Sequence, residues 1–289
     1  MLFDDIQRSR FLGKPARLFV FERQGTVIGR FTGAPIDLTI GGDTYVSAQI
    51  DRSEIKETPE KAKDKITVKF AYLRDPGAPL GTLPSTQALG DHWHPYVPAD
   101  EVRVTCLAWL IGATDAPKQE WVGTVVGPAF SDVELTLTCQ PGQTRARSVN
   151  QGPKVGRACW KTPYSQGPRG CGMQLDDFEI AATDIVVSGL TLTAVAFADA
   201  PLNLAGGWFE WTRGDGLTDQ RTIMAHTGDS IVLQWGANDL GDIVAGSAWP
   251  TCPQNWDGCA ERFADPENHY GGAIYLPVAD PLQDSMSWG

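Results

Sequence analysis

Short runs of alternating apolar and polar residues, separated by glycine and proline, most limit how this 289-residue chain can fold. Residues 65–72, Lys-Ile-Thr-Val-Lys-Phe-Ala-Tyr, alternate with the period of two that is typical of a strand buried on one face. The chain also has 31 glycines and 20 prolines, which favour tight turns over long helices. We therefore predict a mainly β fold with little helix.

Other runs extend this prediction along the whole chain. We predict strands at 17–22, 36–40, 44–48, 65–72, 101–111, 121–126, 133–138, 183–187, 190–194, 207–211 and 230–235. The triplet 41–43, Gly-Gly-Asp, predicts a hairpin turn between two of them. Residues 75–100 are rich in proline and glycine and predict a long loop or a protruding arm. The sequence has no repeat of fixed period.

The charge of the chain disfavours a general nucleic-acid binder. Its net charge is −11, whereas binding to phosphate needs a basic surface. The charge is uneven, because residues 173–289 hold 17 acids and 3 bases while residues 1–172 carry a net charge of +3. Six bases and no acid lie between residues 139 and 172, namely Arg145, Arg147, Lys154, Arg157, Lys161 and Arg169. This stretch is either a solvated linker or a surface that meets the acidic C-terminal half, an acidic partner or an anionic centre.

The six cysteines fall into two classes by context. Cys106 and Cys139 lie in apolar alternating runs, where a thiol acts as a small buried hydrophobe. The other four, Cys159, Cys171, Cys252 and Cys259, lie among glycine, proline and aromatic residues. No secretory signal or membrane-length apolar segment is expected, so a reducing cytosol is the default compartment. In that compartment, clustered cysteines are more often metal ligands than disulfides.

Two loop pairs of cysteines match either tetrahedral zinc or a four-cysteine iron–sulfur cluster. The intervals between paired cysteines are 11 and six residues, wider than the two to four that zinc knuckles usually have. The spacing therefore leans towards a cluster, but zinc and a disulfide within each pair stay open.

Other functional motifs are weaker. His92 and His94 have the spacing of two ligands on a strand, yet no third ligand is near, so we predict an exposed loop. The sequence has no metalloprotease helix, nucleophile elbow or phosphate-binding loop, which disfavours an enzyme. A series of tryptophans supports an alternative, a zinc-stabilised carbohydrate- or receptor-binding module: Trp208, Trp211, Trp235, Trp249 and Trp256.

The cysteine loops carry a family resemblance. The segments that carry it are Ala158-Cys-Trp160, Gly170-Cys-Gly172, Cys252 to Cys259 with Arg262-Phe263, and Asn268-His-Tyr-Gly-Gly272. Together they resemble the tail-hub family of long-tailed bacteriophages and gene transfer agents, which includes the minor tail protein L type. The hairpin segment Gly207–Thr212 and the run Ile223–Leu233 also resemble this family. The match covers about residues 158–277, and the region that begins at Pro15 matches mainly in order and length.

This resemblance implies a baseplate hub at the tail tip that forms a homotrimeric ring. Its implied neighbours are the distal tail protein, the central tip or fibre protein and the tape measure protein. Residues 1–145 would form two tube-type β-barrel domains, with 75–100 as the arm. Residues 146–289 would form a β-rich domain that holds a [4Fe–4S] cluster through Cys159, Cys171, Cys252 and Cys259. The implied location is the virion tail tip, after assembly in the bacterial host cytoplasm.

Overall fold

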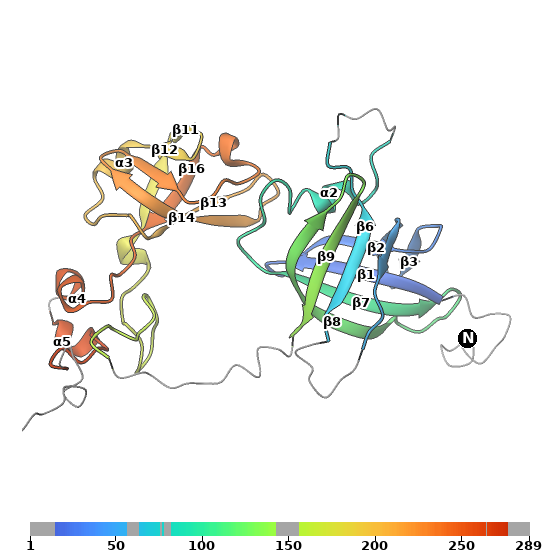
Figure 1. Cartoon of the computed structure of the whole chain (residues 1–289), viewed down its shortest axis with the longest axis horizontal. Helices are drawn as coiled ribbons and strands as arrows, with labels where there is room; N and C mark the ends of the chain where they lie inside the picture. The colour runs from blue at the N-terminus through green and yellow to red at the C-terminus, as the bar shows by residue number, and fades with distance from the viewer. Residues whose placement is uncertain are drawn as a thin grey trace, which may run out of the picture. The chain divides into compact units, whose positions relative to one another are not determined.

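The computed structural model describes residues 15–56, 64–75, 77, 82–142, 156–263 and 265–276. The chain divides into two compact units, residues 1–148 and 149–289. Strands dominate both units (Figure 1), and the longest helix among the described residues has seven residues. The prediction of a mainly β chain with little helix is confirmed.

The described part of the first unit forms one nine-stranded sheet. Its strands are β1 Pro15–Arg23, β2 Thr26–Thr32, β3 Leu38–Ile40, β4 Asp43–Ser47, β5 Ile50–Arg52, β6 Ile66–Ala71, β7 Val102–Leu110, β8 Lys118–Phe130 and β9 Glu134–Pro141. One short helix, α2 at Gln87–Gly90, lies between β6 and β7. The strand order is β3-β4-β2-β1-β7-β8-β9-β6-β5, and the neighbours are antiparallel except for β2 with β4.

The two ends of this sheet meet because the chain joins them directly. β4, near one end, and β5, at the other end, are separated only by Ala48 and Gln49. Consecutive Cα atoms are about 3.8 Å apart, so the facing strand ends are at most about 11 Å apart. The Ala48 amide donates to the Thr32 carbonyl on β2 (2.9 Å), and the Ala71 amide on β6 donates to the Gln49 carbonyl (3.1 Å). The sheet therefore curls back on itself (Figure 1).

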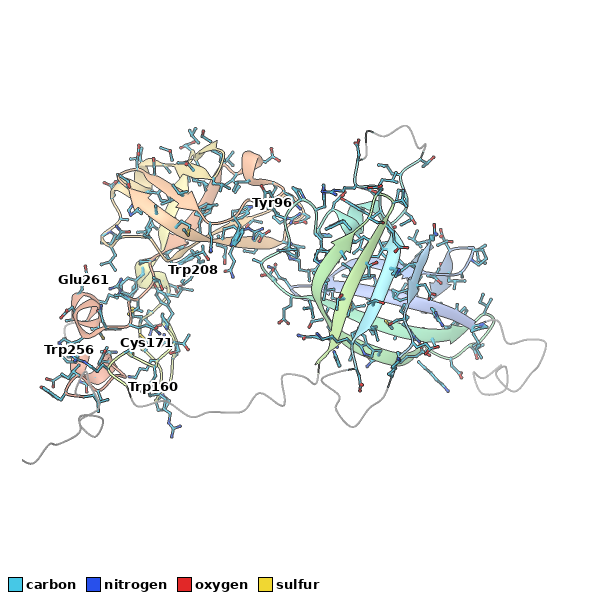
Figure 2. The ribbon with its side chains drawn as sticks, in the orientation of Figure 1. Tyr96, Trp160, Cys171, Trp208, Trp256 and Glu261 are labelled. Atoms are coloured by element: carbon cyan, nitrogen blue, oxygen red, sulfur yellow. The ribbon has the colours of Figure 1, made fainter. Side chains whose placement is uncertain are left out.

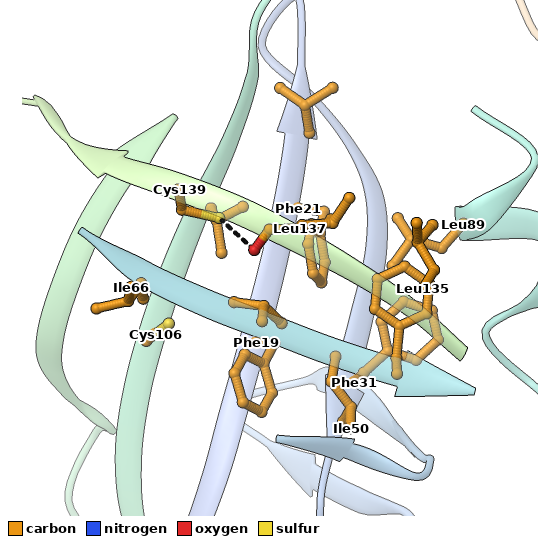
Figure 3. Close-up of a cluster of buried hydrophobic side chains, with 14 of the residues drawn as sticks. Phe19, Phe21, Phe31, Ile50, Ile66, Leu89, Cys106, Leu135, Leu137 and Cys139 are labelled. Atoms are coloured by element: carbon orange, nitrogen blue, oxygen red, sulfur yellow. Dashed lines mark hydrogen bonds between the residues drawn. The ribbon is translucent and has the colours of Figure 1, made fainter. Parts of the chain in front are cut away.

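The middle of β1 is buried on both faces, which explains why residues 18–21, Leu-Phe-Val-Phe, are continuously apolar. Phe19 and Phe21 belong to the main core with Cys106 of β7 and Leu137 of β9 (Figure 3). Leu18 belongs to a second cluster, which includes side chains of the β3–β4 hairpin. Burying a large apolar side chain contributes about 1.5–3 kcal/mol, so the core phenylalanines anchor the curled sheet.

Cys106 and Cys139 are core residues, as their apolar context predicted. They are 1% and 0% exposed, and the Cys139 thiol contacts the Leu137 carbonyl (3.8 Å; Figure 3). Burial raises the pKa of each thiol to about 12. The folded protein therefore keeps both thiols protonated at a pH where an unfolded chain would ionise them.

We expect the free energy of unfolding to fall as the pH rises from about 9 towards 12, because only the unfolded state then releases these thiol protons. Below the pKa that these thiols have in the unfolded chain, they are protonated in both states, and the free energy of unfolding keeps its full value. Urea unfolding across this pH range measures the free energy of unfolding. That free energy should fall less steeply with pH in the C106A/C139A double variant than in wild type. An unchanged slope would contradict this assignment.

The second unit forms a seven-stranded sheet among its described residues, in the order β10-β16-β13-β14-β15-β12-β11. Its strands are β10 Ile180–Thr183, β11 Val186–Ser188, β12 Thr191–Thr193, β13 Trp208–Thr212, β14 Thr218–Thr227, β15 Ser230–Leu233 and β16 Ala245–Trp249. Its helices are α3 Val195–Ala198, α4 Trp256–Arg262 and α5 Pro266–His269, with the 3-10 turns η3 Asp176–Phe178 and η4 Leu240–Asp242.

This second sheet is closed in the same way as the first. Its two end strands, β10 and β11, are joined by Asp184 and Ile185 alone. Asp184 has φ of 55°, the left-handed conformation that turns the chain sharply. Ile185 is buried in the core of the second unit, and its amide donates to the Val244 carbonyl (3.2 Å).

The two sheets share a plan of connections. In each, a two-residue link leads into an antiparallel pair of strands, β5–β6 in the first sheet and β11–β12 in the second. A one-turn helix follows, α2 or α3, and after it a three-stranded meander, β7–β9 or β13–β15. The last meander strand pairs with the second strand of the earlier pair. Each helix buries one apolar side chain in its core, Leu89 in α2 and Phe197 in α3. β1 and β16 both pair with the first strand of a meander, β7 and β13 respectively. They differ in chain order, because β1 comes before the shared series of elements and β16 comes after it.

The location of the two sheets differs from the prediction. We predicted two tube-type barrels within residues 1–145, but the described residues there form one sheet. The second sheet lies at residues 180–249, within the predicted four-cysteine domain. All nine described strands of the first range pair in this one sheet, so none of them is left for a second barrel.

Residues 86–93, within the described part of the predicted arm, are packed rather than protruding, whereas Tyr96 and Val97 are 41% and 53% exposed. Leu89 and Trp93 are 2% and 3% exposed and belong to the core of the first unit. The Gln87 side chain pairs with both backbone groups of Leu73, at 3.0 Å each. The arm prediction is wrong for this part, since proline and glycine indicate irregular backbone but not exposure. Residues 76 and 78–81 lie outside the described residues.

Candidate metal centre

The four loop cysteines lie in one part of the second unit, outside its sheet. We name this part the cysteine lobe and define it as residues 156–175 and the described residues of 250–276. It contains α4 and α5 (Figure 1), and Figure 2 labels Cys171 within it. Cys171 and Cys259 are buried, whereas Cys159 and Cys252 are partly exposed. The lobe thus brings together residues almost a hundred positions apart in the sequence.

Cys171 is placed by a tight turn of the first cysteine loop. Its amide donates to the Ser165 hydroxyl oxygen (3.0 Å), and the Gly172 amide donates to the Ser165 carbonyl (2.9 Å). A Cβ at Gly170 would lie 2.4 Å from that carbonyl oxygen, so the turn needs glycine. The glycines beside Cys171 therefore serve the geometry of the loop.

Cys259 is placed by α4. The Asn255 side chain caps this helix by accepting a hydrogen bond from the Gly258 amide (2.7 Å). Arg262 then ties the helix to the preceding loop, donating to the carbonyls of Gly258 and Thr251 at 2.8 Å each. The second cysteine loop is thus fixed at both of its ends.

Gln254 links the two cysteine loops. Its amide donates to the Cys252 sulfur (3.4 Å), and its carbonyl accepts from the Cys159 amide (2.8 Å). Its side chain donates to the Lys161 carbonyl (3.2 Å). Gln254 has φ of 55°, an uncommon conformation outside glycine, which is maintained by these contacts on both sides. Sequence reasoning did not single out this residue.

The pKa of the Cys259 thiol depends on the other three loop cysteines. It is raised to about 11, first by burial and then by the charges of Cys252, Cys159 and Cys171. The Lys161 ammonium acts in the opposite direction. Four thiolates can therefore share this region only if positive charge, such as that of metal ions, compensates them. Lys161 is one base of the predicted basic stretch, of which Arg145, Arg147 and Lys154 lie outside the described residues.

The donor set fits a thiolate-bound centre in its chemistry. It offers four cysteine sulfurs, and two of these accept backbone N–H groups, as the sulfurs of clusters do. In the part of the chain that the structure describes, no three His, Cys, Asp or Glu side chains have the arrangement that would hold a single metal ion. Cys159, Cys171, Cys252 and Cys259 are therefore candidate ligands only.

Aromatic rings join the cysteine lobe to the sheet. The Tyr164 ring meets the Trp208 ring edge-on (5.5 Å between centroids), and Trp208 stacks on Trp249 (5.6 Å). The Tyr164 hydroxyl donates to the Pro250 carbonyl. These tryptophans therefore hold the lobe against β13 and β16.

The other candidates from the sequence do not form a common site. Trp211 is 3% exposed and donates to Asp239 (3.1 Å), whereas Trp235 is 62% exposed, so the tryptophans form no single platform. His94 packs between the rings of Tyr72 and Phe130, at 6.0 and 5.5 Å. The expectation of an exposed histidine loop is wrong at His94, because aromatic neighbours distant in sequence cover it.

The first unit contains a wide groove of about 1570 Å³ in its described residues. It is lined by the start of β1, by β5 and β6, and by apolar side chains such as Ile36 and Val133. Three ion pairs lie along it: Arg17–Asp51, Lys69–Glu134 and Arg52–Glu120. No thiol lines this groove, which is therefore separate from the cysteine lobe.

Comparison with known proteins supplies a relative and a structural neighbour. No protein-family model matches the chain. It is 49% identical over 173 residues, 60% of its length, to an uncharacterized protein of Xylella fastidiosa (strain 9a5c), of which the match covers 35%. The chain thus spans about a third of that relative. A chain in the solved virion of a native gene transfer agent particle matches with a TM-score of 0.69 at 15% identity, over 99% of this chain and 98% of that one. At this identity the likeness shows a shared fold.

One further finding concerns membranes. Among the residues with described positions, no helix has the length and apolar character required to cross a bilayer.

Proposed function

We propose that this chain is a structural virion protein, the hub of the tail tip of a long, non-contractile-tailed bacteriophage or gene transfer agent. The observation that carries the proposal is the shared plan of the two curled sheets. Three chains with two such sheets each would supply six similar positions around one ring. The shared fold with a chain of a gene transfer agent virion supports this reading.

A closed ring would also give the end strands of each sheet defined neighbours. β5 and β11 are three-residue strands at the ends of their sheets. Such short end strands limit uncontrolled pairing with other chains, and ring closure would place defined neighbours beside them. In this proposal the neighbours are the other two copies, the distal tail protein and the central tip or fibre protein, with the tape measure protein as a further contact. The role is non-enzymatic and involves no sequence-specific nucleic acid.

We further propose a [4Fe–4S] cluster as the resident cofactor, with Cys159, Cys171, Cys252 and Cys259 as ligands. A bound cluster would supply a bridge between two loops about a hundred residues apart. Metal-binding free energy becomes folding free energy when the unfolded chain has no preformed site. The cluster would therefore fasten the cysteine lobe. Zinc in the same thiol set remains the alternative, and with it a carbohydrate- or receptor-binding module.

Oligomeric state tests the hub directly. Native mass spectrometry of the anaerobically purified full chain should give three times the 31.3 kDa mass of one chain. Electron microscopy of the same sample should show rings with six similar densities. A monomer at micromolar concentration that also fails to bind distal tail protein would contradict the hub. Binding to a glycan array by such a monomer would favour the alternative.

A further inference from the structure

A third segment, besides the two cysteine loops, contacts the candidate ligands. We name it the clasp and define it as residues 265–273, of which 266–269 form α5. The Gly271 amide donates to the Cys159 sulfur (3.2 Å). The ring Nδ1 of His269 lies 3.0 Å from the Cys171 carbonyl. The clasp follows α4, which holds Cys259, and so runs from the second cysteine loop back to the first.

Gly271 fits closely against the first loop. A Cβ at this position would lie 2.8 Å from Lys161 Cγ, 3.2 Å from Trp160 Nε1 and 3.3 Å from the Cys159 sulfur. The absence of a side chain is therefore what allows the amide to reach the sulfur. Two flanking bonds hold the segment here, from the Ala273 amide to the Gly156 carbonyl (2.8 Å) and from the Tyr270 hydroxyl to the Arg157 carbonyl.

His269 is held on two sides. Its ring stacks on Phe263 at 3.8 Å with an interplanar angle of 2°, and its Nε2 lies 3.4 Å from an Asp265 oxygen. A carbonyl oxygen can only accept a hydrogen bond, so Nδ1 carries the proton that it donates to the Cys171 carbonyl. A Cβ at Gly172 would lie 2.9 Å from His269 Nδ1, so this contact is also close-packed.

We propose that the clasp is a retaining element of the four-cysteine centre, with Gly271 and His269 as positioning residues for Cys159 and Cys171. This inference rests on the proposed cluster. An amide that donates to a ligand sulfur and a ring packed against a ligand carbonyl fix the orientation of the two thiolates. Changes to such outer contacts typically cost 10–100-fold in metal affinity. The clasp also covers Cys159, the more exposed thiol of the first loop.

The test compares two glycine variants of the full chain. G271A should release iron to a chelator about 10–100-fold faster than wild type, measured as loss of visible absorbance. G214A is the matched control, because Gly214 lies in the β13–β14 turn, outside the cysteine lobe, and a Cβ there meets no atom within 4 Å. Equal release from G271A and G214A would overturn the proposal.

His269 supplies a second variant in case G271A fails to fold. H269A should also release iron faster, whereas H269N, which can keep a polar group facing the Cys171 carbonyl, should restore part of the retention. Release at the wild-type rate from both would count against a positioning role.

Failure of the cluster and failure of the clasp are distinguishable. If wild-type protein binds no iron, the cluster is wrong, and the rate at which iodoacetamide modifies Cys159 in metal-free protein tests the clasp. That rate should rise in G271A and stay unchanged in G214A. No increase in G271A would overturn the clasp as a cover for Cys159.

Discussion

Alanine in place of Cys171 is expected to reduce bound iron from about four atoms per chain to none, while both sheets keep their strands. Cys171 is 6% exposed, so water would replace its thiolate poorly. With one of the four thiolates lost, the iron atoms lack one ligand and one compensating negative charge. Because metal binding contributes to folding, the cysteine lobe should then lose its order. The same result is expected at Cys159, Cys252 and Cys259.

Elemental analysis and visible absorbance of anaerobically purified variants measure this outcome. C106A and C139A are matched controls, because both thiols are buried in the core of the first unit. They should keep their iron and stay brown. Iron retained in C171A, or lost in either control, would contradict the ligand set. If the protein holds one zinc per chain and no iron, the proposed cluster is wrong but the proposed set of four ligands stands.

The strand pattern of the sequence predicted much of the fold, for a physical reason. A strand with one face in the core alternates apolar and polar residues, as β6 does from Ile66 to Phe70 and β7 does from Val102 to Cys106. The hairpin at residues 36–48 exists as β3 and β4, whose turn uses Gly41 and Gly42 at positive φ. These features depend on neighbours in sequence, so the sequence alone predicts them.

Strands made of small residues escaped this reasoning. β16, Ala-Gly-Ser-Ala-Trp, has no β-branched residue and was not predicted. Its composition follows from packing, because a Cβ at Gly246 would lie 2.4 Å from the Phe209 ring of the neighbouring strand. The segment 183–187 was predicted as one strand but is divided at Asp184, where the closing link turns. Both features depend on strand partners far away in the sequence.

The candidate site likewise combines residues that local sequence identifies with residues that only long-range contacts identify. Local context separated the four loop cysteines from Cys106 and Cys139, since apolar alternation surrounds only the latter two. The roles of Gln254 and the clasp depend on contacts across 90 or more positions, from Gln254 to Lys161 and from Gly271 to Cys159. The residues Asn268 to Gly272 were noticed only as part of a family resemblance, because their spacing carries no metal-binding signature of its own.

The packed position of residues 86–93 leads to a second large effect. Alanine in place of Trp93 is expected to destabilise the first unit by about 3–5 kcal/mol, the typical cost of truncating a buried aromatic side chain. Trp93 is 3% exposed and contributes to the same core as Phe19 and Phe21. Removing residues 77–92 should for the same reason unfold the first unit, since it deletes α2 with Leu89.

Hydrogen exchange in the full chain can assign this loss to one unit. W93A should raise exchange in β6 and β9, which form the core around α2, and leave β13 and β14 of the second unit unchanged. L83A is the matched control, because Leu83 is 47% exposed and truncation of a surface side chain costs at most about 0.5 kcal/mol. If residues 82–100 served only as an arm for neighbouring subunits, W93A and L83A would exchange alike in the monomer, and only the assembled ring would distinguish them.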